Sequence, residues 1–217
     1  IRKKMKKTLL QVVLIILAIV LTYLIYDTVR RPIDFKKEKD KRYAAVVDKL
    51  KDIRKAELAY KDVNNKFTGS WDTLLTFVKH DSLPLVRKIG SLTDSMIDAG
   101  WTEDKALREG KIIRDTVKVA VLDSVFGKSY PIDKLPIIPY TNGKKFFLGA
   151  TRVKTGSGVD VAVFEARAHN NIILNQLEKE YGQEIINLNE KSRVDGKYPG
   201  LKVGSLTEAN NNAGNWE

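Results

Sequence analysis

The first candidates for chemistry in this sequence are its two histidines, as metal ligands or bases, and the serine of a Gly-Ser-Gly run, as a nucleophile. The two histidines, His80 and His169, lie far apart, and apart from the adjacent Asp81 neither has a ligand-like partner at helical spacing. A metal site needs several converging ligands, so we interpret both histidines as polar surface residues. Gly156-Ser157-Gly158 lacks the strand–turn–helix context and the G-x-S-x-G spacing of a serine nucleophile. We therefore interpret it as the turn of a hairpin.

Paired charges give no stronger signal for catalysis. Asp94 and Asp98 lie one helical turn apart, as many solvated carboxylates do. Glu165 and Arg167 project from the same face of a predicted strand, and an exposed salt bridge explains them. No phosphate-binding or dinucleotide-binding glycine motif occurs. The chain is therefore predicted not to be an enzyme and to hold no metal and no cofactor.

The C-terminal residues raise an alternative to simple docking. Asn210-Asn211-Asn212 and Trp216 combine amides with an aromatic face, a combination that suits sugars and hence peptidoglycan. A tail that docks on protein explains them as well. The chain has no cysteine, which excludes disulfides and thiolate-held metals.

The element that must position the rest is an apolar span near the N-terminus. Residues 8–26, TLLQVVLIILAIVLTYLIY, contain no charged residue. At a helical rise of about 1.5 Å they cover about 30 Å, the thickness of the hydrocarbon layer. The span is apolar on every face, unlike the core helix of a soluble protein. It is followed by no small-x-small cleavage site, so we predict an uncleaved transmembrane helix over 8–29.

The positive charge of the chain is concentrated around this span. Residues 1–66 carry 18 Lys and Arg against 8 Asp and Glu, whereas residues 67–217 carry 20 against 19. Basic residues beside a membrane helix pair with lipid headgroups, while a nucleic-acid-binding body would need its own basic face. We thus expect membrane lipid and no nucleic acid as partners. Both flanks are basic, so charge does not set the orientation. The predicted membrane-interface residues are Arg2, Lys3, Lys4, Lys6, Lys7, Tyr23, Tyr26, Arg30 and Arg31.

A charged amphipathic helix is predicted next, over about 34–64, after Pro32 has kinked or ended the first helix. Its apolar residues recur at three- and four-residue steps and form one stripe. The stripe either packs on the chain's own domain or joins a coiled coil, and Glu57 occupies a position in its seam. The face that would meet a partner helix consists of Tyr43, Val46, Leu50, Ile53 and Tyr60.

The rest of the chain is predicted to form short helices followed by strands. Ser70 is predicted to cap a helix over 71–78, and Thr102 to cap one that Gly110 closes. A strand is expected over 111–121 and a hairpin over 146–154 and 159–168. A helix over 171–181 follows, and 184–192 remains ambiguous. Residues 83–101 give no clear pattern, and no regular element is expected from Gly204 onward.

The predicted fold class is α+β: a single N-terminal transmembrane helix, a long amphipathic helix and a small antiparallel-sheet domain. The predicted regions are a basic tail (1–7), the anchor (8–29), the amphipathic or coiled-coil helix (33–65), the α+β domain (66–203) and a C-terminal tail (204–217).

One stretch carries a family resemblance. LKDIRKAELAYKDVNNKFTGSWDTLLTFV, residues 50–78, resembles the place where pilins and pseudopilins leave their long N-terminal helix. Residues 43–92 and the tail YPGLKVGSLTEANNNAGNWE, 198–217, are similar to uncharacterised membrane-anchored proteins of Bacteroidota. The resemblance implies a pilin-like layout in the bacterial inner membrane, single-pass, with the body in the periplasm. The N-terminus IRKKMKK departs from pilins, which carry an acidic residue near the start of their apolar segment.

We therefore expect a non-enzymatic, membrane-anchored structural or assembly subunit of a cell-envelope complex for secretion, motility or transport. It would act by docking to other envelope proteins as a homo- or hetero-oligomer. The alternatives are a pilin-like or pseudopilin-like filament subunit and a peptidoglycan-binding periplasmic protein.

Overall fold

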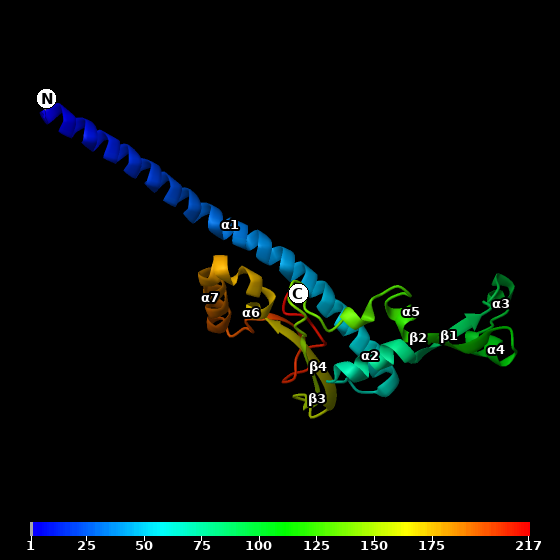
Figure 1. Ribbon diagram of the computed structural model, residues 1–217. Helices are drawn as coiled ribbons and strands as arrows, with labels where there is room; N and C mark the ends of the chain where they lie inside the picture. The colour runs from blue at the N-terminus through cyan, green and yellow to red at the C-terminus, as the bar shows by residue number, and fades with distance from the viewer. Residues whose placement is uncertain (1) are drawn as a thin grey trace. The chain divides into compact units, whose positions relative to one another are not determined.

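The computed structural model describes residues 2–217, apart from the side chains of residues 2–10 and 85–88. It is a mixture of helices and small sheets, as the α+β prediction states, and begins with a long apolar helix (Figure 1). Its elements, in chain order, are α1 (Arg2–Asn64), α2 (Trp71–His80), β1 (Ser82–Ile89), α3 (Asp94–Asp98), α4 (Glu103–Arg108), β2 (Ile113–Ala120), α5 (Val121–Val125), η1 (Ile132–Lys134), β3 (Phe147–Lys154), β4 (Asp160–His169), α6 (Asn170–Ile173), η2 (Asn175–Leu177), α7 (Glu178–Val194) and β5 (Gly200–Gly204).

Two compact units divide these elements. The first contains the chain up to Asp48 with residues 138–144 and 168–201, and the second contains residues 49–137, 145–167 and 202–217. The single helix α1 therefore supplies residues to both units.

α1 continues through Pro32, so our expectation that the helix could end there is wrong. Proline removes one backbone donor and crowds the preceding turn, at a cost of about 3 kcal/mol. The residues that follow recover more than this, because Phe35 is buried and Val46, Leu50 and Ile53 are completely so. Tertiary packing thus keeps the helix intact where local propensity would break it.

The stripe of the second half of α1 lies inside the chain's own fold. Val46, Leu50 and Ile53 have no exposed surface, Tyr60 is buried, and Tyr43 is half-buried. Of the two interpretations of this stripe, packing on its own domain is the one the structure bears out. Four of the five residues that we assigned to a partner-helix face are therefore core residues, and Tyr43 is partly covered beside them, because the body supplies the apolar surface that a coiled-coil partner would have supplied.

Capping determines where the short helices begin. The Ser70 side chain accepts the N–H of Thr73 at the start of α2, and Thr102 accepts the N–H of Lys105 at the start of α4. Both caps were predicted from the sequence. The chain leaves α4 through Gly110, whose φ of +68° suits glycine.

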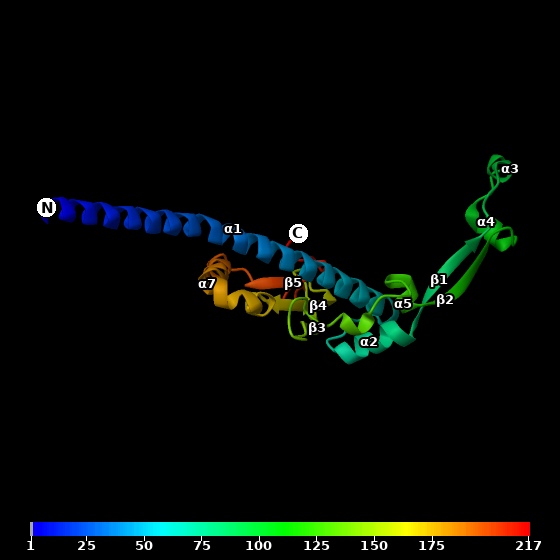
Figure 2. The same ribbon diagram turned by 45° about the horizontal axis from the view of Figure 1, so that its top comes forward.

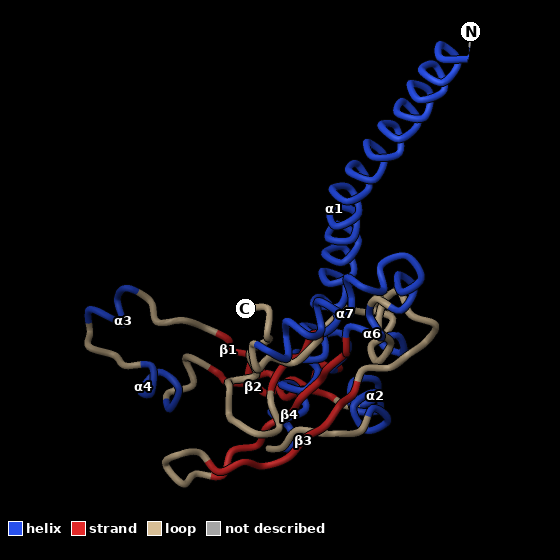
Figure 3. Tube along the Cα trace, turned by 90° about the vertical axis from the view of Figure 1, so that its left-hand side faces the viewer, coloured by secondary structure: helices blue, strands red, loops and turns tan. Residues whose placement is uncertain are grey.

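Each of the two sheets is small. β1 and β2 form an antiparallel ribbon that carries α3 and α4 at its far end (Figure 2). β3 and β4 form the predicted hairpin (Figure 3), in register from Phe147 opposite Arg167 to Lys154 opposite Asp160. β5 completes a sheet of order β3-β4-β5. The hairpin turns at Gly156-Ser157-Gly158, where Gly158 has a φ of +80°.

Helical structure after β4 is more broken than the sequence predicts. The expected helix over 171–181 is divided into α6, η2 and the first turn of α7, and Tyr181 has non-helical dihedrals within α7. Tyr181 is buried with its ring 5.5 Å from that of Phe35, so packing on α1 outweighs regular helix geometry here. The ambiguous segment 184–192 is helical, as part of α7.

Candidate functional site

The first half of α1 presents an apolar surface that nothing in the described chain covers. An 18-residue window in this part of the helix has a mean hydropathy of 2.5, and none of it is buried. Ile19 and Tyr23 keep about two thirds of their surface exposed, at 65% and 66%. By length and composition this helix could be a membrane span or a signal sequence, and in the described part of the chain one helix meets that criterion.

Two threonine hydroxyls of this apolar half are satisfied within the helix. The Thr22 hydroxyl donates to the carbonyl of Ala18 at 2.8 Å, and that of Thr28 donates to the carbonyl of Leu24 at 2.7 Å. An unsatisfied hydroxyl is costly in an apolar medium, and these bonds remove that cost. These two threonines are therefore compatible with a hydrocarbon environment.

Arg30 and Arg31 stand where the apolar span ends, and they have different roles. Arg30 pairs with Asp34 at 3.0 Å and lies over the ring of Tyr26, 6.0 Å from its centroid. Arg31 instead joins α7, because it pairs with Glu184 at 2.8 Å and donates to the carbonyl of Glu180. Arg31 is thus a structural link within the first unit, although its sequence position alone indicated a headgroup contact.

The other predicted interface residues divide into two sets. Tyr23 and Tyr26 are exposed on α1, at 66% and 59%. The side chains of the basic tail lie outside the described residues, so their assignment to the interface stays a prediction. They are Arg2, Lys3, Lys4, Lys6 and Lys7.

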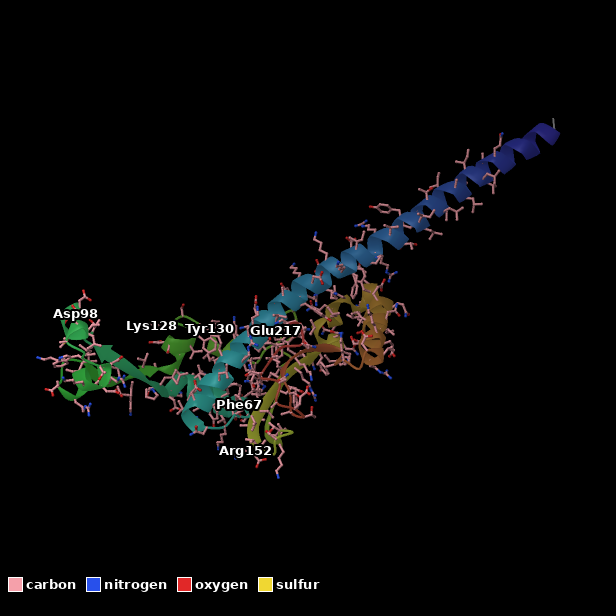
Figure 4. The ribbon with its side chains drawn as sticks, turned by 180° about the vertical axis from the view of Figure 1, so that it is seen from behind. Phe67, Asp98, Lys128, Tyr130, Arg152 and Glu217 are labelled. Carbon is pink, nitrogen blue, oxygen red and sulfur yellow. The ribbon has the colours of Figure 1, made fainter. Side chains whose placement is uncertain are left out.

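A polar groove of about 440 Å³ lies in the second unit, between the turn after α1 and the β3–β4 hairpin. Lys66 and Arg152 are its charged residues, and Thr68, Thr73 and Thr151 contribute hydroxyls. Phe67 and Arg152 are labelled in Figure 4. The groove's lining holds no carboxylate, imidazole or thiol, and its cationic side chains and hydroxyls supply hydrogen-bond donors for binding.

The floor beneath this groove is built by close backbone packing. A Cβ atom at Gly69 would lie 3.2 Å from the nitrogen of Ala150 and 3.4 Å from the Cα of Gly149. Glycine at 69 therefore lets the turn rest directly on β3. The Trp71 indole adds a hydrogen bond of 3.0 Å to the carbonyl of Phe146, which holds α2 against the sheet.

Glu57 is a buried acid next to this groove. It has no exposed surface, its Oε2 accepts the backbone N–H of Thr68 at 3.1 Å, and its Oε1 has no hydrogen-bond partner among the described residues. Burial raises the pKa of Glu57 to about 8, against the opposing effect of the Thr68 hydrogen bond. The side chain is therefore largely protonated at neutral pH, and it joins the end of α1 to the turn before α2.

The histidines are not brought into a ligand cluster. His80 is exposed at the end of α2. His169 caps α6, where its Nδ1 accepts the N–H of Asn171 at 3.1 Å, and burial lowers its pKa. Within residues 2–217 no group of three or more His, Cys, Asp or Glu side chains is arranged to hold a metal.

The predicted charge pairs have different environments. Glu165 and Arg167 form the expected ion pair at 2.8 Å, but Glu165 is buried rather than exposed. Lys202 of β5 approaches the same carboxylate at 3.7 Å, so the pair helps hold β5 to β4. Asp94 and Asp98 are both exposed on α3, as expected of a solvated pair, and Figure 4 shows Asp98 at the far end of the β1–β2 ribbon.

The C-terminal tail forms no helix or strand after β5, as expected, but tertiary contacts hold it in place. Val203 and Gly214 form a β-bridge, and Gly204 donates to the carbonyl of Ala213 at 3.0 Å. Arg54 of α1 pairs with Glu217 at 2.7 Å and donates to the carbonyl of Asn212 at 3.2 Å. These contacts are long-range in sequence, which is why local patterns did not reveal them.

Two further features were missed from the sequence. The β1 strand lies in the segment that gave no pattern, and its pairing with β2 is visible only in three dimensions. Glu57 did leave a signal, because a carboxylate at an apolar-stripe position must be either exposed or buried at a cost. No protein-family model, curated protein or solved structure matches this chain.

Proposed function

We propose that this chain is a non-enzymatic, membrane-anchored structural or assembly subunit of a bacterial cell-envelope complex, and that it acts by protein–protein docking. One observation carries the proposal: the uncovered apolar half of α1 continues, without a break at Pro32, into a half whose stripe is the core of the folded body. A helix of this kind places a docking body next to a bilayer.

The anchoring part of the proposal rests on energetics. About 25 cal/mol is lost for each Å² of apolar surface left in water, and side chains along the whole apolar half are about half exposed or more, including Val13 (53%), Ile15 (60%) and Ile25 (66%). Hydrocarbon removes this cost, and a helix satisfies its own backbone groups there. The basic residues Arg30 and Lys36 that follow suit the headgroup layer.

The placement in the inner membrane with a periplasmic body rests on the resemblance to pilins and to membrane-anchored Bacteroidota proteins. The absence of cysteine makes this testable with one introduced thiol. Ser157 is exposed in the hairpin turn, so Ser157→Cys gives an accessible label site. A membrane-impermeant maleimide should label it in intact spheroplasts, and labelling that requires lysis would place the body in the cytoplasm.

Anchoring is tested by a double substitution in the span. Ile16→Arg with Val20→Arg adds about 5 kcal/mol or more to the cost of insertion, because both side chains lie mid-span. The matched control is Ile186→Arg with Val194→Arg, two exposed positions on α7 (55% and 85%). After an alkaline carbonate wash, wild type and control should stay in the membrane pellet and the span variant should leave it.

Two results of this fractionation would contradict the anchor. Wild type that is released by carbonate would not be integral. A soluble mature species whose mass lacks the apolar span would identify the span as a signal sequence. The docking role is tested separately by cross-linking in native membranes, where recovery of monomer alone would count against it.

A pilin-like filament subunit is a second candidate, supported by the unbroken passage of α1 from its apolar half into the body. Pilins mature by removal of a basic leader, so the two candidates differ in the N-terminus of the mature chain. N-terminal sequencing of protein from native membranes separates them. A mature chain that begins after the basic residues, together with sheared filaments that contain it, would favour the filament.

A further inference from the structure

A charged pocket of about 250 Å³ lies where α1 leaves its apolar span. The two helices that line it, α1 and α7, meet within the first unit, where α7 lies beside α1 (Figure 1, Figure 2). The lining residues are Asp27, Arg30, Arg31 and Asp34 of α1 with Glu180 and Tyr181 of α7. The four α1 positions recur at three- and four-residue steps and share one helix face. The pocket therefore begins at the first residue after the uncharged span.

The charges of this pocket are not all engaged within the protein. Arg31 is held by Glu184 at 2.8 Å and by the carbonyl of Glu180. Arg30 stays accessible, because its side chain is 62% exposed and that of its partner Asp34 is 41% exposed. An ion pair this exposed contributes little to stability, so both members can bind a ligand instead. The accessible lining thus offers one guanidinium group together with three carboxylates.

This combination of charges favours an organic ammonium group over a metal ion. Within the described residues no three or more carboxylates or imidazoles converge as ligands for a metal. An ammonium group needs no such convergence, because each of its N–H groups can donate to a different carboxylate. The guanidinium group of Arg30 requires an anion in the same ligand. The pocket therefore suits a molecule that carries both an ammonium group and a phosphate or carboxylate.

An apolar trough on α1 leads up to the pocket. It is lined by Ile15, Ala18, Ile19, Thr22, Tyr23 and Tyr26. Ala18 and Thr22 lie one turn apart and are smaller than their neighbours, which leaves room for a hydrocarbon chain against the helix. Arg30 lies over the ring of Tyr26, 6.0 Å from its centroid, so the trough and the pocket meet at this pair. A polar pocket at the end of an apolar trough matches the two parts of an amphiphile.

The order of the charges along α1 follows the order of the groups in a phospholipid. Arg30 lies about one turn beyond the span, and Asp34 lies one turn beyond Arg30. In a phospholipid the phosphate is joined to the glycerol, and the ammonium group of the head is farther from the acyl chains. We propose that this pocket binds a phospholipid with a primary ammonium group, with its phosphate on Arg30 and its ammonium group on Asp34 and Glu180. One acyl chain lies in the trough.

The lining selects among phospholipid head groups. A primary ammonium group has three N–H donors for carboxylates, whereas a quaternary group has none and is recognised by cages of aromatic rings. The pocket contributes one ring, that of Tyr181, beside its three carboxylates. A head group without a cation would place its phosphate near these carboxylates with nothing to offset the repulsion. Phosphatidylethanolamine is therefore the expected ligand.

This inference gives the proposed anchor a specific lipid, and so it rests on the proposed function. The two fail in different ways. A chain that is released by the carbonate wash would remove the anchor and the lipid site together. An integral chain that binds every phospholipid alike would remove the lipid site and leave the anchor in place.

Native mass spectrometry of the full-length chain in mild detergent tests the head group. Phosphatidylethanolamine, phosphatidylcholine and phosphatidylglycerol with identical acyl chains are added separately at matched concentrations. The first should form an adduct at about tenfold lower concentration than the others, as expected for one additional charge-assisted hydrogen bond. Equal adducts with all three lipids would overturn the proposal. Equal binding of free phosphoethanolamine, which has no acyl chain, would assign the pocket to a soluble phosphate ester and overturn the lipid.

Substitutions at exposed positions separate the two polar contacts. Arg30→Gln should weaken all three lipids, because each carries a phosphate. Glu180→Gln keeps the backbone carbonyl that Arg31 uses, and it should weaken phosphatidylethanolamine about tenfold without weakening the other two. The matched controls are Arg193→Gln and Glu190→Gln, an exposed ion pair of α7 outside the pocket, and both should bind as wild type does. A preference for phosphatidylethanolamine that survives Glu180→Gln would contradict the proposed contact.

The trough is tested in the same assay. Ala18→Leu fills it and should weaken every phospholipid without changing the preference among head groups. Val20→Leu, at a position of the span outside the trough lining, is the matched control and should bind as wild type does. Unchanged binding of phosphatidylethanolamine by Ala18→Leu would overturn the placement of the acyl chain.

Discussion

Glu57→Gln is predicted to remove a pH dependence from the stability of this protein. In the folded chain the acid holds its proton up to about pH 8, because it is fully buried, whereas its ordinary pKa is 4.5. Between these values the unfolded chain binds fewer protons than the folded one. The free energy of unfolding therefore falls as pH rises through this window, and the contribution of Glu57 is complete below pH 4.5 and lost above pH 8.

The size of the effect follows from the interval between the two pKa values. Each pH unit between the two pKa values changes the free energy of unfolding by about 1.4 kcal/mol. Glu57 therefore lowers that free energy by on the order of 3 kcal/mol between pH 4.5 and pH 7. In the wild-type chain the backbone N–H of Thr68 donates to Oε2 of Glu57 at 3.1 Å. Glutamine stays neutral at every pH, and its amide oxygen can accept the same hydrogen bond. The variant should match wild type near pH 4.5 and exceed it by a few kcal/mol at pH 8.

The measurement is chemical denaturation of the full-length chain in mild detergent, from pH 4.5 to pH 8.5, followed by tryptophan fluorescence. Trp71 is a suitable reporter because its indole is fixed to the carbonyl of Phe146. The difference between variant and wild type isolates Glu57, since other titrating groups are common to both. Parallel curves for the two proteins across this range would refute the reasoning.

Glu165→Gln is the matched control for this substitution. Glu165 is also buried, but it pairs with Arg167 at 2.8 Å and approaches Lys202 at 3.7 Å. Glutamine there removes a charge that two cations use, so this variant should lose stability at pH 7 and gain none at pH 8. A gain of stability in both variants would show that the effect is not specific to the buried carboxyl group of Glu57, whose Oε1 has no hydrogen-bond partner among the described residues.

Two further substitutions test the packing. Tyr43→Phe removes the hydroxyl that donates to Asn170 at 2.5 Å, and it should lower the free energy of unfolding by about 1 kcal/mol at any pH below 10, since burial raises the tyrosine pKa to about 12. An unchanged denaturation midpoint would contradict this. Gly204→Ala forces a Cβ against the backbone of β4 and a side chain into a φ of +72°, and thermal unfolding should show a loss of about 1–3 kcal/mol or more. Gly156→Ala, where a Cβ meets nothing within 4 Å, is its control and should be close to neutral.

The elements predicted correctly from the sequence are those with local causes. Ser70 and Thr102 each cap a helix through a bond to a residue three positions on, and the hairpin over β3 and β4 turns on glycines between two alternating strands. These signals are complete within a short window. The prediction of mixed α and β structure, which depends on such signals, is confirmed.

The elements that the sequence did not reveal depend on partners far along the chain. β1 pairs with β2 across a connection that contains two short helices, and the tail returns to Arg54 of α1. Helix breaks after β4 are also set by packing, because Tyr181 leaves helical geometry to meet Phe35. No local window contains both halves of these contacts.

The candidate site also depends on contacts between residues that are distant in sequence. The groove between the turn after α1 and the hairpin brings Lys66 together with Arg152, two residues that share no motif. Arg31 was assigned to the headgroup layer from its position, and the structure pairs it with Glu184. The choice between solvent, lipid and ion pair depends on what the fold places beside each charge.

The sequence alone determined the uncharged span over 8–26, its basic flanks and the amphipathic stripe that follows, because hydrophobicity and helical period are properties of a contiguous segment. Only the tertiary structure decided that α1 passes through Pro32, that the stripe is core and that Glu57 is buried beneath a turn. These outcomes follow from burial against segments distant in sequence, and the burial of Phe35 and Leu50 outweighs the local cost of the proline.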